Sequence, residues 1–385
     1  MRKVAVLGVG QTKISEHWDK SLRDLAVQAI QAALQDANER GIEGLFVGNM
    51  LSGSLSQQEN LATLIAEWSG LRPLEATKFE SACSSGASAF RAGLITVASG
   101  ELDSALIVGV EKMSDAKLLS TTSALATAAD ADYETAHGLS FVALNALLMR
   151  RYMHEYGWEH AAFAPFSITA HQNAGNNPFA RLKDEISITD YTQARMVADP
   201  INLLDASPIG DGAAAVLLVP AEDFASMSSK PQVDVIASAA SIDRIAIHDR
   251  SDPLWLSAAE KSAKKAYTQA GAAPDAVDIF ELHDAFTIIT ALSLEACGFA
   301  KRGSGPRLGL IGEISLEGRI PISTAGGLKA RGHPVGATGI YQIVEVTLQL
   351  RGDAGENQVD PARIGMAQNI GGSGATVITH ILEKQ

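Results

Sequence analysis

Cysteine is scarce in this chain of 385 residues, which contains only Cys83 and Cys297. Two cysteines so far apart exclude a disulfide framework and a thiolate-rich metal site, and they are typical of a reducing compartment. The sequence also lacks the HExxH and CxxC metal-binding motifs and the Walker A phosphate-binding motif. We therefore predict an active site without a metal and without a bound cofactor.

Long apolar runs are absent as well. No segment reaches the roughly 18 apolar residues that a membrane-spanning helix needs, and the first residues lead into a strand-like run without a signal-peptide core. We expect a soluble, cytoplasmic protein. The formal net charge of −13 at pH 7 argues against nucleic acid as the main partner, and a polyanionic ligand would need a local basic patch.

The predicted helices and strands repeat once along the chain. Each half contains an amphipathic helix, a buried strand, a strand–turn–helix unit and two further strands. In the first half these span residues 21–37, 44–50, 76–99, 105–110 and 213–219. In the second half they span residues 257–270, 277–283, 321–350, 364–368 and 375–381. Strands that alternate with helices predict parallel sheets covered by helices.

A polar segment over residues 221–231 separates the two halves, with three serines and a terminal proline. The length prior is roughly two to three domains, and we predict two, residues 1–225 and 232–385. Residues 115–200 do not fit the repeat. We expect this insertion in the first half to form a lid or binding subdomain.

Cys83 lies in Glu80-Ser-Ala-Cys-Ser-Ser-Gly, where a predicted strand turns into a predicted helix. Unpaired N–H groups and the positive end of the helix dipole favour thiolate, the nucleophilic form. An isolated free cysteine is more often a small buried hydrophobe. That second interpretation suits Cys297, which lies beside a predicted helix C-cap, whereas the motifs below favour a nucleophile at Cys83.

Two histidines lie where a catalytic group is expected. His333 follows the glycine-rich run that begins at Gly326, and Pro334 fixes the backbone beside it, so its imidazole is held rigidly at a helix start, as a general base requires. His283 ends a predicted strand at the carboxyl edge of a sheet, where ligand sites gather. Asp284 either orients this imidazole or caps the next helix.

A second glycine-rich run, Asn369-Ile-Gly-Gly-Ser-Gly, lies between two predicted strands near the C-terminus. Closely spaced glycines let backbone N–H groups approach a ligand and can supply an oxyanion hole. The alternative is a tight turn without a ligand. We favour the oxyanion hole, because the nucleophile and both histidines lie at comparable strand ends.

These four motifs together resemble the thiolase family. Ser-Ala-Cys-Ser-Ser-Gly, His-Asp-Ala-Phe, Gly-His-Pro-Val-Gly-Ala-Thr-Gly and Asn-Ile-Gly-Gly-Ser-Gly occur in that order, and the resemblance covers essentially the whole chain. His-Asp-Ala-Phe is similar to the sterol-carrier-protein-2 type and to archaeal acetoacetyl-CoA thiolases. The resemblance implies an α/β thiolase fold, in which duplicated βαβαβαββ halves form a five-layer αβαβα sandwich with an inserted loop domain.

The resemblance also implies roles for individual residues. Cys83 matches the family nucleophile, His333 the histidine that activates it, and His283 the group that holds one thioester oxygen together with water. Backbone N–H groups of Cys83 and Gly371 would form the second oxyanion hole. The candidate supporting residues are Asn369, Asp284 and Gly372.

The sequence departs from the family at one position. Many thiolases use a second cysteine to move the α-proton, but the matching positions here are Asn369 and Ala285. Proton transfer then falls to His283, His333, water or another group. The implied activity is still that of an acetyl-CoA C-acetyltransferase, which condenses two acetyl-CoA molecules or cleaves acetoacetyl-CoA through an acyl-Cys83 intermediate.

Two other functions are compatible with these residues. The chain could be a 3-ketoacyl-CoA thiolase or acyltransferase for longer or unusual acyl groups, or a non-catalytic scaffold with a thiolase fold. The resemblance further implies a homodimer or tetramer in lipid metabolism and the mevalonate pathway. Its expected partners are a 3-hydroxy-3-methylglutaryl-CoA synthase, which would pull the uphill condensation, and a small zinc-ribbon/OB-fold protein, which would lend a CoA nucleotide site.

Overall fold

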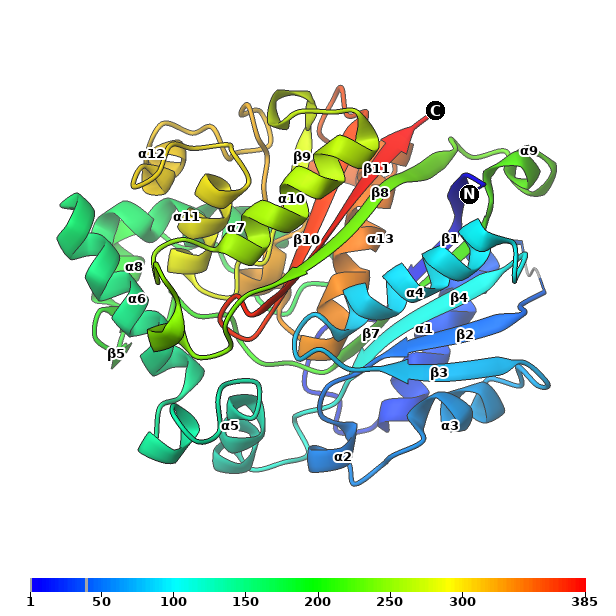
Figure 1. Ribbon diagram of the computed structural model, residues 1–385, viewed down its shortest axis with the longest axis horizontal. Helices are drawn as coiled ribbons and strands as arrows, with labels where there is room; N and C mark the ends of the chain where they lie inside the picture. Colours follow the sequence, from blue (N-terminus) through cyan, green and yellow to red (C-terminus); the bar gives the residue numbers. More distant parts are fainter. Residues whose placement is uncertain (1, 39–40) are drawn as a thin grey trace.

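A computed structural model describes residues 2–38 and 41–385, and in it nine strands form one sheet in the order β3-β2-β4-β7-β1-β8-β11-β10-β9 (Figure 1). The first half contributes β1 (Val4–Gln11), β2 (Gly44–Gly48), β3 (Glu75–Phe79), β4 (Ala105–Glu111) and β7 (Gly212–Pro220). The second half contributes β8 (Val233–Ile242), β9 (Ile279–Glu281), β10 (Ile364–Gly371) and β11 (Thr376–Lys384).

The pairing of strands repeats between the halves. In the first half β1–β7 and β7–β4 are antiparallel, while β4–β2 and β2–β3 are parallel. In the second half β8–β11 and β11–β10 are antiparallel and β10–β9 is parallel. A parallel bridge from Phe280 to Ile322 stands where the first half has β3. The predicted duplication is therefore confirmed, and the single pair Ala5–Asp234 joins β1 to β8.

The sheet is mixed, whereas the alternation of helices and strands predicted a parallel one. Each parallel pair is connected through at least one helix. β10 and β11, in contrast, are joined by the four-residue turn 372–375, and a turn of that length can connect only antiparallel strands. The prediction ended this strand at residue 368 and treated the glycine-rich residues after it as a longer loop, so it missed the short turn. β10 continues through Asn369 to Gly371.

Helices cover both faces of each half and separate the halves from one another. α1 (Leu22–Asp36) and α3 (Leu61–Trp68) pack on the outer face of the first half, and α10 (Ser257–Ala270) and α11 (Thr287–Ala296) on the outer face of the second. α4 (Ser85–Ser99) and α13 (Thr338–Arg351) lie between them. Three hydrophobic cores thus alternate with two half-sheets, which confirms the five-layer αβαβα fold.

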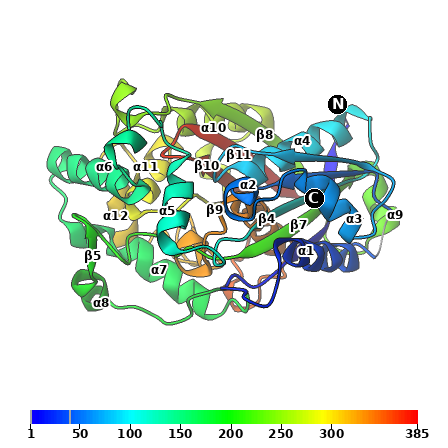
Figure 2. The ribbon, with the colours of Figure 1, turned by 90° about the horizontal axis from the view of Figure 1, so that it is seen from below.

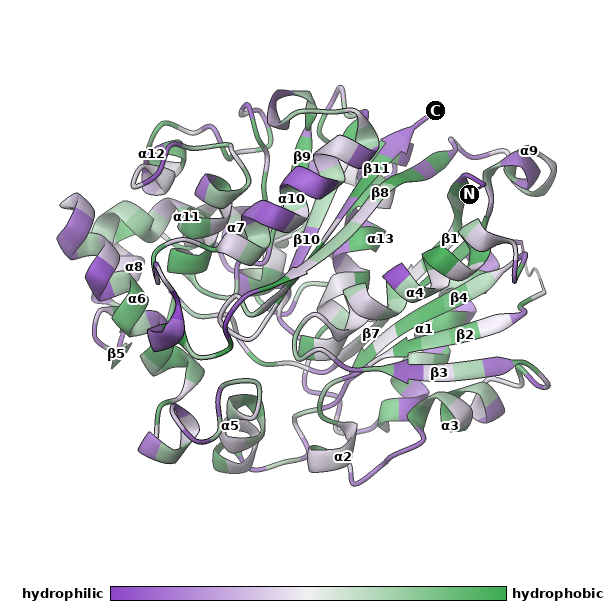
Figure 3. Ribbon diagram, viewed as in Figure 1, coloured by the Kyte–Doolittle hydropathy of each residue, from purple (hydrophilic) through white to green (hydrophobic). Residues whose placement is uncertain are grey.

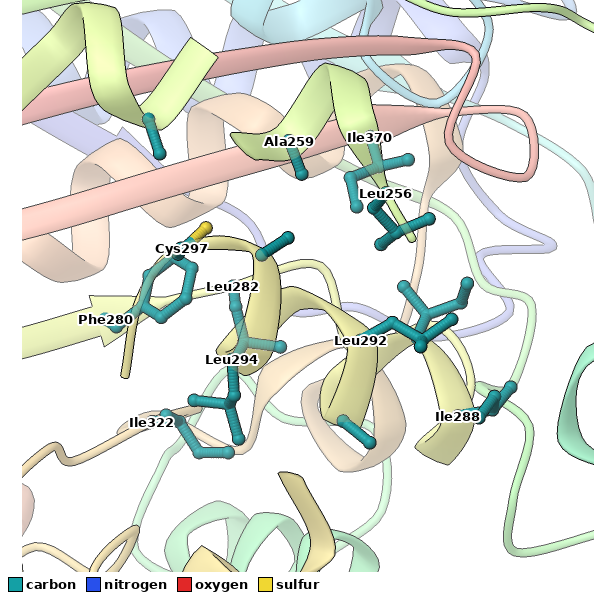
Figure 4. Close-up of a cluster of buried hydrophobic side chains, with 14 of the residues drawn as sticks. Leu256, Ala259, Phe280, Leu282, Ile288, Leu292, Leu294, Cys297, Ile322 and Ile370 are labelled. Carbon is teal, nitrogen blue, oxygen red and sulfur yellow. The ribbon is translucent and has the colours of Figure 1, made fainter. Parts of the chain in front are cut away.

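Burial of the helices agrees with their layers. α13, in the central layer, is buried on nearly all sides, as a helix surrounded by sheets must be. α10, in an outer layer, buries small residues on one side and carries hydrophilic residues on the other (Figure 3). The core beneath α10 and α11 includes Cys297, which is 2% exposed among apolar side chains (Figure 4). Its predicted structural role is therefore confirmed.

The predicted insertion contains mostly helices: α5 (Leu118–Ala126), α6 (Phe141–Tyr156), α7 (Ala164–Gly175) and α8 (Ile188–Gln193). They gather at one end of the molecule with the small sheet of β5 (Met196–Ala198) and β6 (Ile201–Asn202) (Figure 2). The remaining short helices are α2 (Ser52–Leu55), α9 (Phe224–Met227) and α12 (Gly305–Leu310). No helix in the described ranges has the length and apolar character needed to cross a membrane. The predicted domain boundaries stay predictions.

Candidate active site

Cys83, His283 and His333 come together at the meeting of the two halves. The cysteine sulfur and one ring nitrogen of each histidine lie within 4.8 Å of one another, and the two imidazoles meet edge to face with ring centroids 5.1 Å apart. All three side chains line one cavity of about 200 Å³. The structure thus unites the three side chains that the sequence singled out from segments up to 250 residues apart.

Serine hydroxyls hold the turn that carries Cys83. The turn joins β3 to α4, and Ala82 adopts φ +54°, which is unusual for a residue other than glycine. Ser84 Oγ donates to the carbonyl of Ser81 at 2.6 Å, and Ser85 Oγ donates to the carbonyl of Ala82 at 2.6 Å. These neutral hydrogen bonds satisfy the carbonyls of the turn and fix the cysteine just before the helix.

The thiol of Cys83 is protonated at rest, contrary to the expected stabilisation of a thiolate. Burial and the nearby carboxyl of Glu111 raise its pKa to about 12, although the backbone N–H groups of Gly372 and of Cys83 itself act in the opposite direction. The helix terminus is therefore outweighed by desolvation. A neutral thiol needs a base at the moment of attack.

His333 has the properties of that base. Its backbone N–H donates to the carbonyl of Pro208 at 3.2 Å, which fixes the loop between the π-helical turn η6 (Gly327–Arg331) and α13. Its Nδ1 lies 2.7 Å from Thr338 Oγ1, whose hydroxyl donates to the carbonyl of Pro334 at 3.2 Å. Burial, His283 and Arg331 hold the pKa of His333 well below its usual range, so the imidazole is neutral.

His283 is buried opposite. It follows β9 by two residues, as predicted for the carboxyl edge of the sheet. Asn369 Nδ2, from β10, lies 3.0 Å from its Nδ1. Burial and then the charge of Arg331 lower its pKa to about 3. Its neutral ring is therefore held by an amide rather than by a carboxylate.

Asp284 neither hydrogen-bonds His283 nor caps α11, the next helix, so both alternatives predicted for it are wrong. One of its carboxylate oxygens accepts the backbone N–H of Leu328 at 2.7 Å, and the other accepts from Ser323 Oγ at 3.1 Å. The residue before α11 is Phe286. Asp284 instead anchors η6, the turn that leads to His333.

Buried charged side chains lie in and beside the turn that Asp284 anchors. Arg331 pairs with Glu345 of α13, and the fully buried Lys329 donates to the carbonyl of Asp205. Desolvation lowers the pKa of Lys329 to about 8. The charge of Arg331 adds to the burial of both imidazoles in lowering their pKa, so this residue favours neutral histidines at the reacting centre.

The C-terminal glycines approach Cys83 through both Gly371 and Gly372. Gly372 lines the cavity, and its backbone N–H is the one that acts on the thiol. Gly371 pairs with Thr376 in the β10–β11 ladder, and a Cβ on it would lie 2.4 Å from the carbonyl oxygen of Ser81. A Cβ is excluded by close backbone at Gly371, and the backbone N–H of Gly372 acts on the thiol, so both glycines lie beside Cys83.

The insertion supplies much of the cavity wall. Most of the wall is apolar, and its insertion residues are Thr122, Leu125, Ser140, Phe141, Val142 and Asn145. Within the described residues no lysine or arginine lines it. A thiolate and two imidazoles at this spacing match the donor types of a zinc site, but in this geometry the cysteine is protonated and one imidazole nitrogen faces Asn369.

Two residues of the site were not identified from the sequence. Thr338 lies in the motif of His333, but nothing in the spacing alone shows that its hydroxyl reaches the ring. Glu111 ends β4 and accepts backbone N–H bonds from Met50, Leu51 and Gly336, so it ties the two halves together beside the cysteine. Burial raises its pKa to about 7. The signal in the sequence that could have identified Glu111 was an acidic residue at the end of an apolar strand.

Family models match both halves of the chain. The model described as thiolase, N-terminal domain, matches residues 4–222, and the one described as thiolase C-terminal domain-like matches residues 239–384. This chain belongs to the thiolase family. The resemblance carried by the four motifs is therefore confirmed.

Curated thiolases of similar length align along the whole chain. An acetyl-CoA acetyltransferase of Methanothermobacter thermautotrophicus is 45% identical over 100% of both chains, and one of Methanocaldococcus jannaschii is 39% identical over 99% of both. Sterol carrier protein 2 of Gallus gallus is 30% identical over 98% of this chain and 71% of its own length. The predicted archaeal-type and sterol-carrier-protein-2 branch is thus supported.

Solved structures share the fold at lower identity. The structure named Ltp2-ChsH2(DUF35) aldolase superposes with a TM-score of 0.86 at 22% identity, over 99% of this chain and 98% of its own. An acetyl-CoA acetyltransferase from Syntrophomonas wolfei superposes with a TM-score of 0.74 at 19% identity, over 100% of both chains. These similarities confirm the thiolase fold.

Proposed function

We propose that this thiolase is an acetyl-CoA C-acetyltransferase, which forms or cleaves acetoacetyl-CoA through an acetyl-Cys83 intermediate. The observation that carries the proposal is the meeting of the Cys83 thiol with two neutral imidazoles in one apolar cavity. The archaeal relatives that align along the full chain bear the name of this activity.

The first half-reaction follows from the geometry. His333 Nε2 takes the proton of the Cys83 thiol as the sulfur attacks the thioester carbon of acetyl-CoA. The oxygen that becomes negative accepts hydrogen bonds from backbone N–H groups at Cys83, Gly371 and Gly372. His283 serves as a further donor. Each such donor contributes about 10²–10³ in rate. The CoA thiolate then leaves and takes the proton from His333, and acetyl-Cys83 remains.

We keep the predicted backbone N–H groups of Cys83 and Gly371 in the oxyanion hole and propose Gly372 as a further donor. Gly372 lines the cavity, and its backbone N–H lowers the pKa of the thiol, which supports it as a donor beside Gly371. We keep Asp284 in a supporting role, because it anchors the turn before His333, and Asn369 in contact with His283.

Acyl-chain length decides between the proposed activity and a 3-ketoacyl-CoA thiolase for longer groups. The cavity of about 200 Å³ is below the 300 to 1,000 Å³ of ordinary ligand pockets, which favours short acyl groups. A series of 3-ketoacyl-CoA substrates tests this: a steep loss of kcat/KM beyond four carbons is expected. A flat series would support the longer-chain alternative.

The site implies partners. Because the cavity wall carries no lysine or arginine and the chain has a net charge of −13, we propose that a small zinc-ribbon/OB-fold protein completes the binding site for the CoA nucleotide. The name of the similar structure Ltp2-ChsH2(DUF35) also joins two components. A 3-hydroxy-3-methylglutaryl-CoA synthase would remove acetoacetyl-CoA in the mevalonate pathway, which would place the reaction in the cytoplasm.

We further propose a homodimer built on the β3 edge. β3 ends the sheet in the described chain and its side chains are half-buried or exposed, and an unpaired edge is a ready surface for a second strand. Sedimentation of the purified protein at two concentrations tests this: a stable dimer is expected.

Intact-mass measurement tests the function directly. We expect wild-type protein incubated with acetoacetyl-CoA to gain one acetyl group, which free CoA removes, and Cys83→Ala protein to gain none. Cys297→Ala serves as the matched control, since it removes the other thiol of the chain, which lies in the outer core of the second half and away from the cavity. An acetyl group on the Cys83→Ala protein, or full biological activity of that variant, would contradict the proposal and would favour the scaffold alternative.

A further inference from the structure

Only three titratable side chains line the cavity among the described residues: Cys83, His283 and His333. The other buried thiol, Cys297, lies in the outer core of the second half, where its sulfur contacts Gln368 at 3.4 Å. Once Cys83 carries an acetyl group, the protein has two imidazoles left for proton transfer at carbon. The hydrogen bonds of each ring decide which of them can accept a proton.

His333 has its accepting nitrogen on the cavity side. The Thr338 hydroxyl donates to the carbonyl of Pro334, so its lone pair faces His333 Nδ1. That contact of 2.7 Å requires a proton on Nδ1. A neutral imidazole carries one proton, and Nε2 of His333 is therefore a free base.

His283 has the opposite arrangement. The Asn369 Nδ2 amide donates to its Nδ1 at 3.0 Å, so Nδ1 carries the lone pair and Nε2 carries the proton. A ring in this state can donate to a substrate oxygen through Nε2 but cannot take a proton there. Asn369 stands at the position where many thiolases have their second cysteine, which acts as a base. In this chain the residue at that position instead keeps His283 in the tautomer that donates a hydrogen bond through Nε2.

We propose that His333 is the single base of both half-reactions, with Thr338 and Asn369 as positioning residues that set opposite tautomers on the two histidines. The inference rests on the proposed acetyltransferase function. It explains how the chain makes a carbon–carbon bond without a second cysteine.

The condensation step balances with these groups alone. A second acetyl-CoA loses an α-proton to His333 Nε2, and its enolate oxygen accepts a hydrogen bond from His283 Nε2–H. The enolate carbon attacks the carbonyl carbon of acetyl-Cys83, which forms the new C–C bond and breaks the C–S bond. The released Cys83 thiolate takes the proton from His333. Acetoacetyl-CoA leaves, and all three side chains return to their starting states.

Thr338→Val tests the proposal because it keeps the side-chain shape and removes the hydroxyl. Exchange of labelled CoA into acetyl-CoA measures acyl transfer alone. Condensation is measured separately, by adding acetyl-CoA to enzyme already acetylated with S-acetyl-N-acetylcysteamine and desalted, with NADH and a 3-hydroxyacyl-CoA dehydrogenase in excess to consume the product. We expect Thr338→Val to slow both reactions by the same factor, about 10- to 100-fold.

Two variants control for structural effects. Thr338→Ser restores the hydroxyl and should recover most of both rates. Thr347→Val removes another buried hydroxyl of α13 that donates to the carbonyl four residues earlier, at 2.7 Å, and it touches neither histidine; its rates should match wild type. If Thr338→Val slows exchange but leaves condensation of the acetylated enzyme at the wild-type rate, a different base moves the α-proton and the proposal is wrong.

The tautomers can be observed without any activity, which covers the case in which Thr338→Val does not fold. Long-range 1H–15N spectra of wild type labelled with 15N-histidine distinguish protonated from bare ring nitrogens, and His283→Gln and His333→Gln assign the two rings. We expect Nδ1–H at His333 and Nε2–H at His283, and the reverse at either ring would overturn the proposal. A wild type that never becomes acetylated would instead refute the proposed function and leave these spectra interpretable.

Discussion

The helices α4 and α13 occupy equivalent positions in the two halves, and each begins at the reacting centre. α4 starts two residues after Cys83, and α13 starts five residues after His333. Neutral serine hydroxyls hold the turn before α4, whereas the turn before His333 carries Arg331, which pairs with Glu345 in the middle of α13. One duplicated framework thus carries a nucleophile and a base in different electrostatic settings.

The difference follows from what each group must do. A cation beside Cys83 would create a persistent thiolate, but the thiol here is neutral and its pKa is raised. Burial first, and then the charge of Arg331, keep both imidazoles neutral and therefore able to accept or share a proton. The charges near the two helix starts differ, whereas the pairing of the strands is the same in both halves.

The largest effect is expected at the base itself. His333→Gln keeps a polar side chain of similar size but cannot accept a proton, so acetylation of Cys83 by acetoacetyl-CoA should slow by about 10²–10⁴-fold. Rapid-quench intact mass measures the rate. His380→Gln is the matched control, because His380 is equally buried but lies against Phe90. If His333→Gln protein is acetylated at the wild-type rate, His333 is not the base.

The ion pair of the second half should matter next. Arg331→Met leaves Glu345 buried without its partner, which costs about 3–5 kcal/mol of folding free energy. Urea unfolding measures the loss. The double variant Arg331→Met/Glu345→Leu should recover much of it, since paired apolar side chains replace a buried ion pair at little cost. If the double variant is less stable than either single variant, the surrounding charges and not this pair hold the turn.

Most of the fold and the reacting residues could be predicted from the sequence. The repeat of helices and strands gave the duplicated halves, and motif order gave the family. Cys83 and His283 lie together as expected because each closely follows a strand, β3 and β9, whereas His333 reaches them from the turn between η6 and α13. Gly-rich loops likewise indicated where backbone approaches the thiol.

What the sequence did not provide depends on contacts between different elements of the same half and on the direction of hydrogen bonds. The protonated state of Cys83 comes from burial and from Glu111, a residue of another strand. The role of Asp284 depends on the turn at Leu328, which lies more than forty positions later. Thr338 and Asn369 act through hydrogen bonds whose direction no residue pattern encodes. Local periodicity fixes elements, whereas long-range contacts fix protonation.

A smaller effect is expected where the first turns of α4 and α13 pack closely against their neighbours. A Cβ at Gly339 would lie 2.5 Å from Asn369 Oδ1 and 2.6 Å from the backbone N of Ala87, and a Cβ at Gly86 would lie 2.8 Å from the carbonyl oxygen of Gly336. Each glycine is the second residue of its helix. Gly86→Ala and Gly339→Ala should each lower the free energy of unfolding by about 1–3 kcal/mol.

The two glycine variants should differ in activity. Gly339→Ala also displaces Asn369 from His283, so its condensation rate should fall relative to that of Gly86→Ala at equal folded fraction. Thermal unfolding and the condensation assay together measure both quantities. Gly352→Ala, at the solvent-exposed end of α13 where a Cβ meets nothing, separates crowding from backbone strain, because its φ is +85°. Equal condensation rates for the two variants would show that Asn369 tolerates the shift.

The smallest effect compares one buried carboxyl from each half. Burial raises the pKa of Glu111 to about 7 and that of Glu281 to about 8. Both folded-state values exceed the ordinary 4.5, so the folded protein holds a proton that the unfolded chain has lost. Stability should therefore fall as the pH rises from about 4.5 toward 8, because the folded state binds more protons across that window.

Glutamine at the two positions should then give opposite results. Glu281 accepts from Thr324 through one oxygen only, so the amide of Glu281→Gln replaces a protonated carboxyl, and this variant should be more stable than wild type at pH 8 and nearly unchanged at pH 5. Both oxygens of Glu111 accept N–H bonds, so Glu111→Gln sets an NH₂ against a backbone donor and should lose about 1–3 kcal/mol at both pH values. Urea unfolding at the two pH values measures both effects. If the stability of Glu281→Gln still falls with pH as that of the wild type does, another group causes the pH dependence.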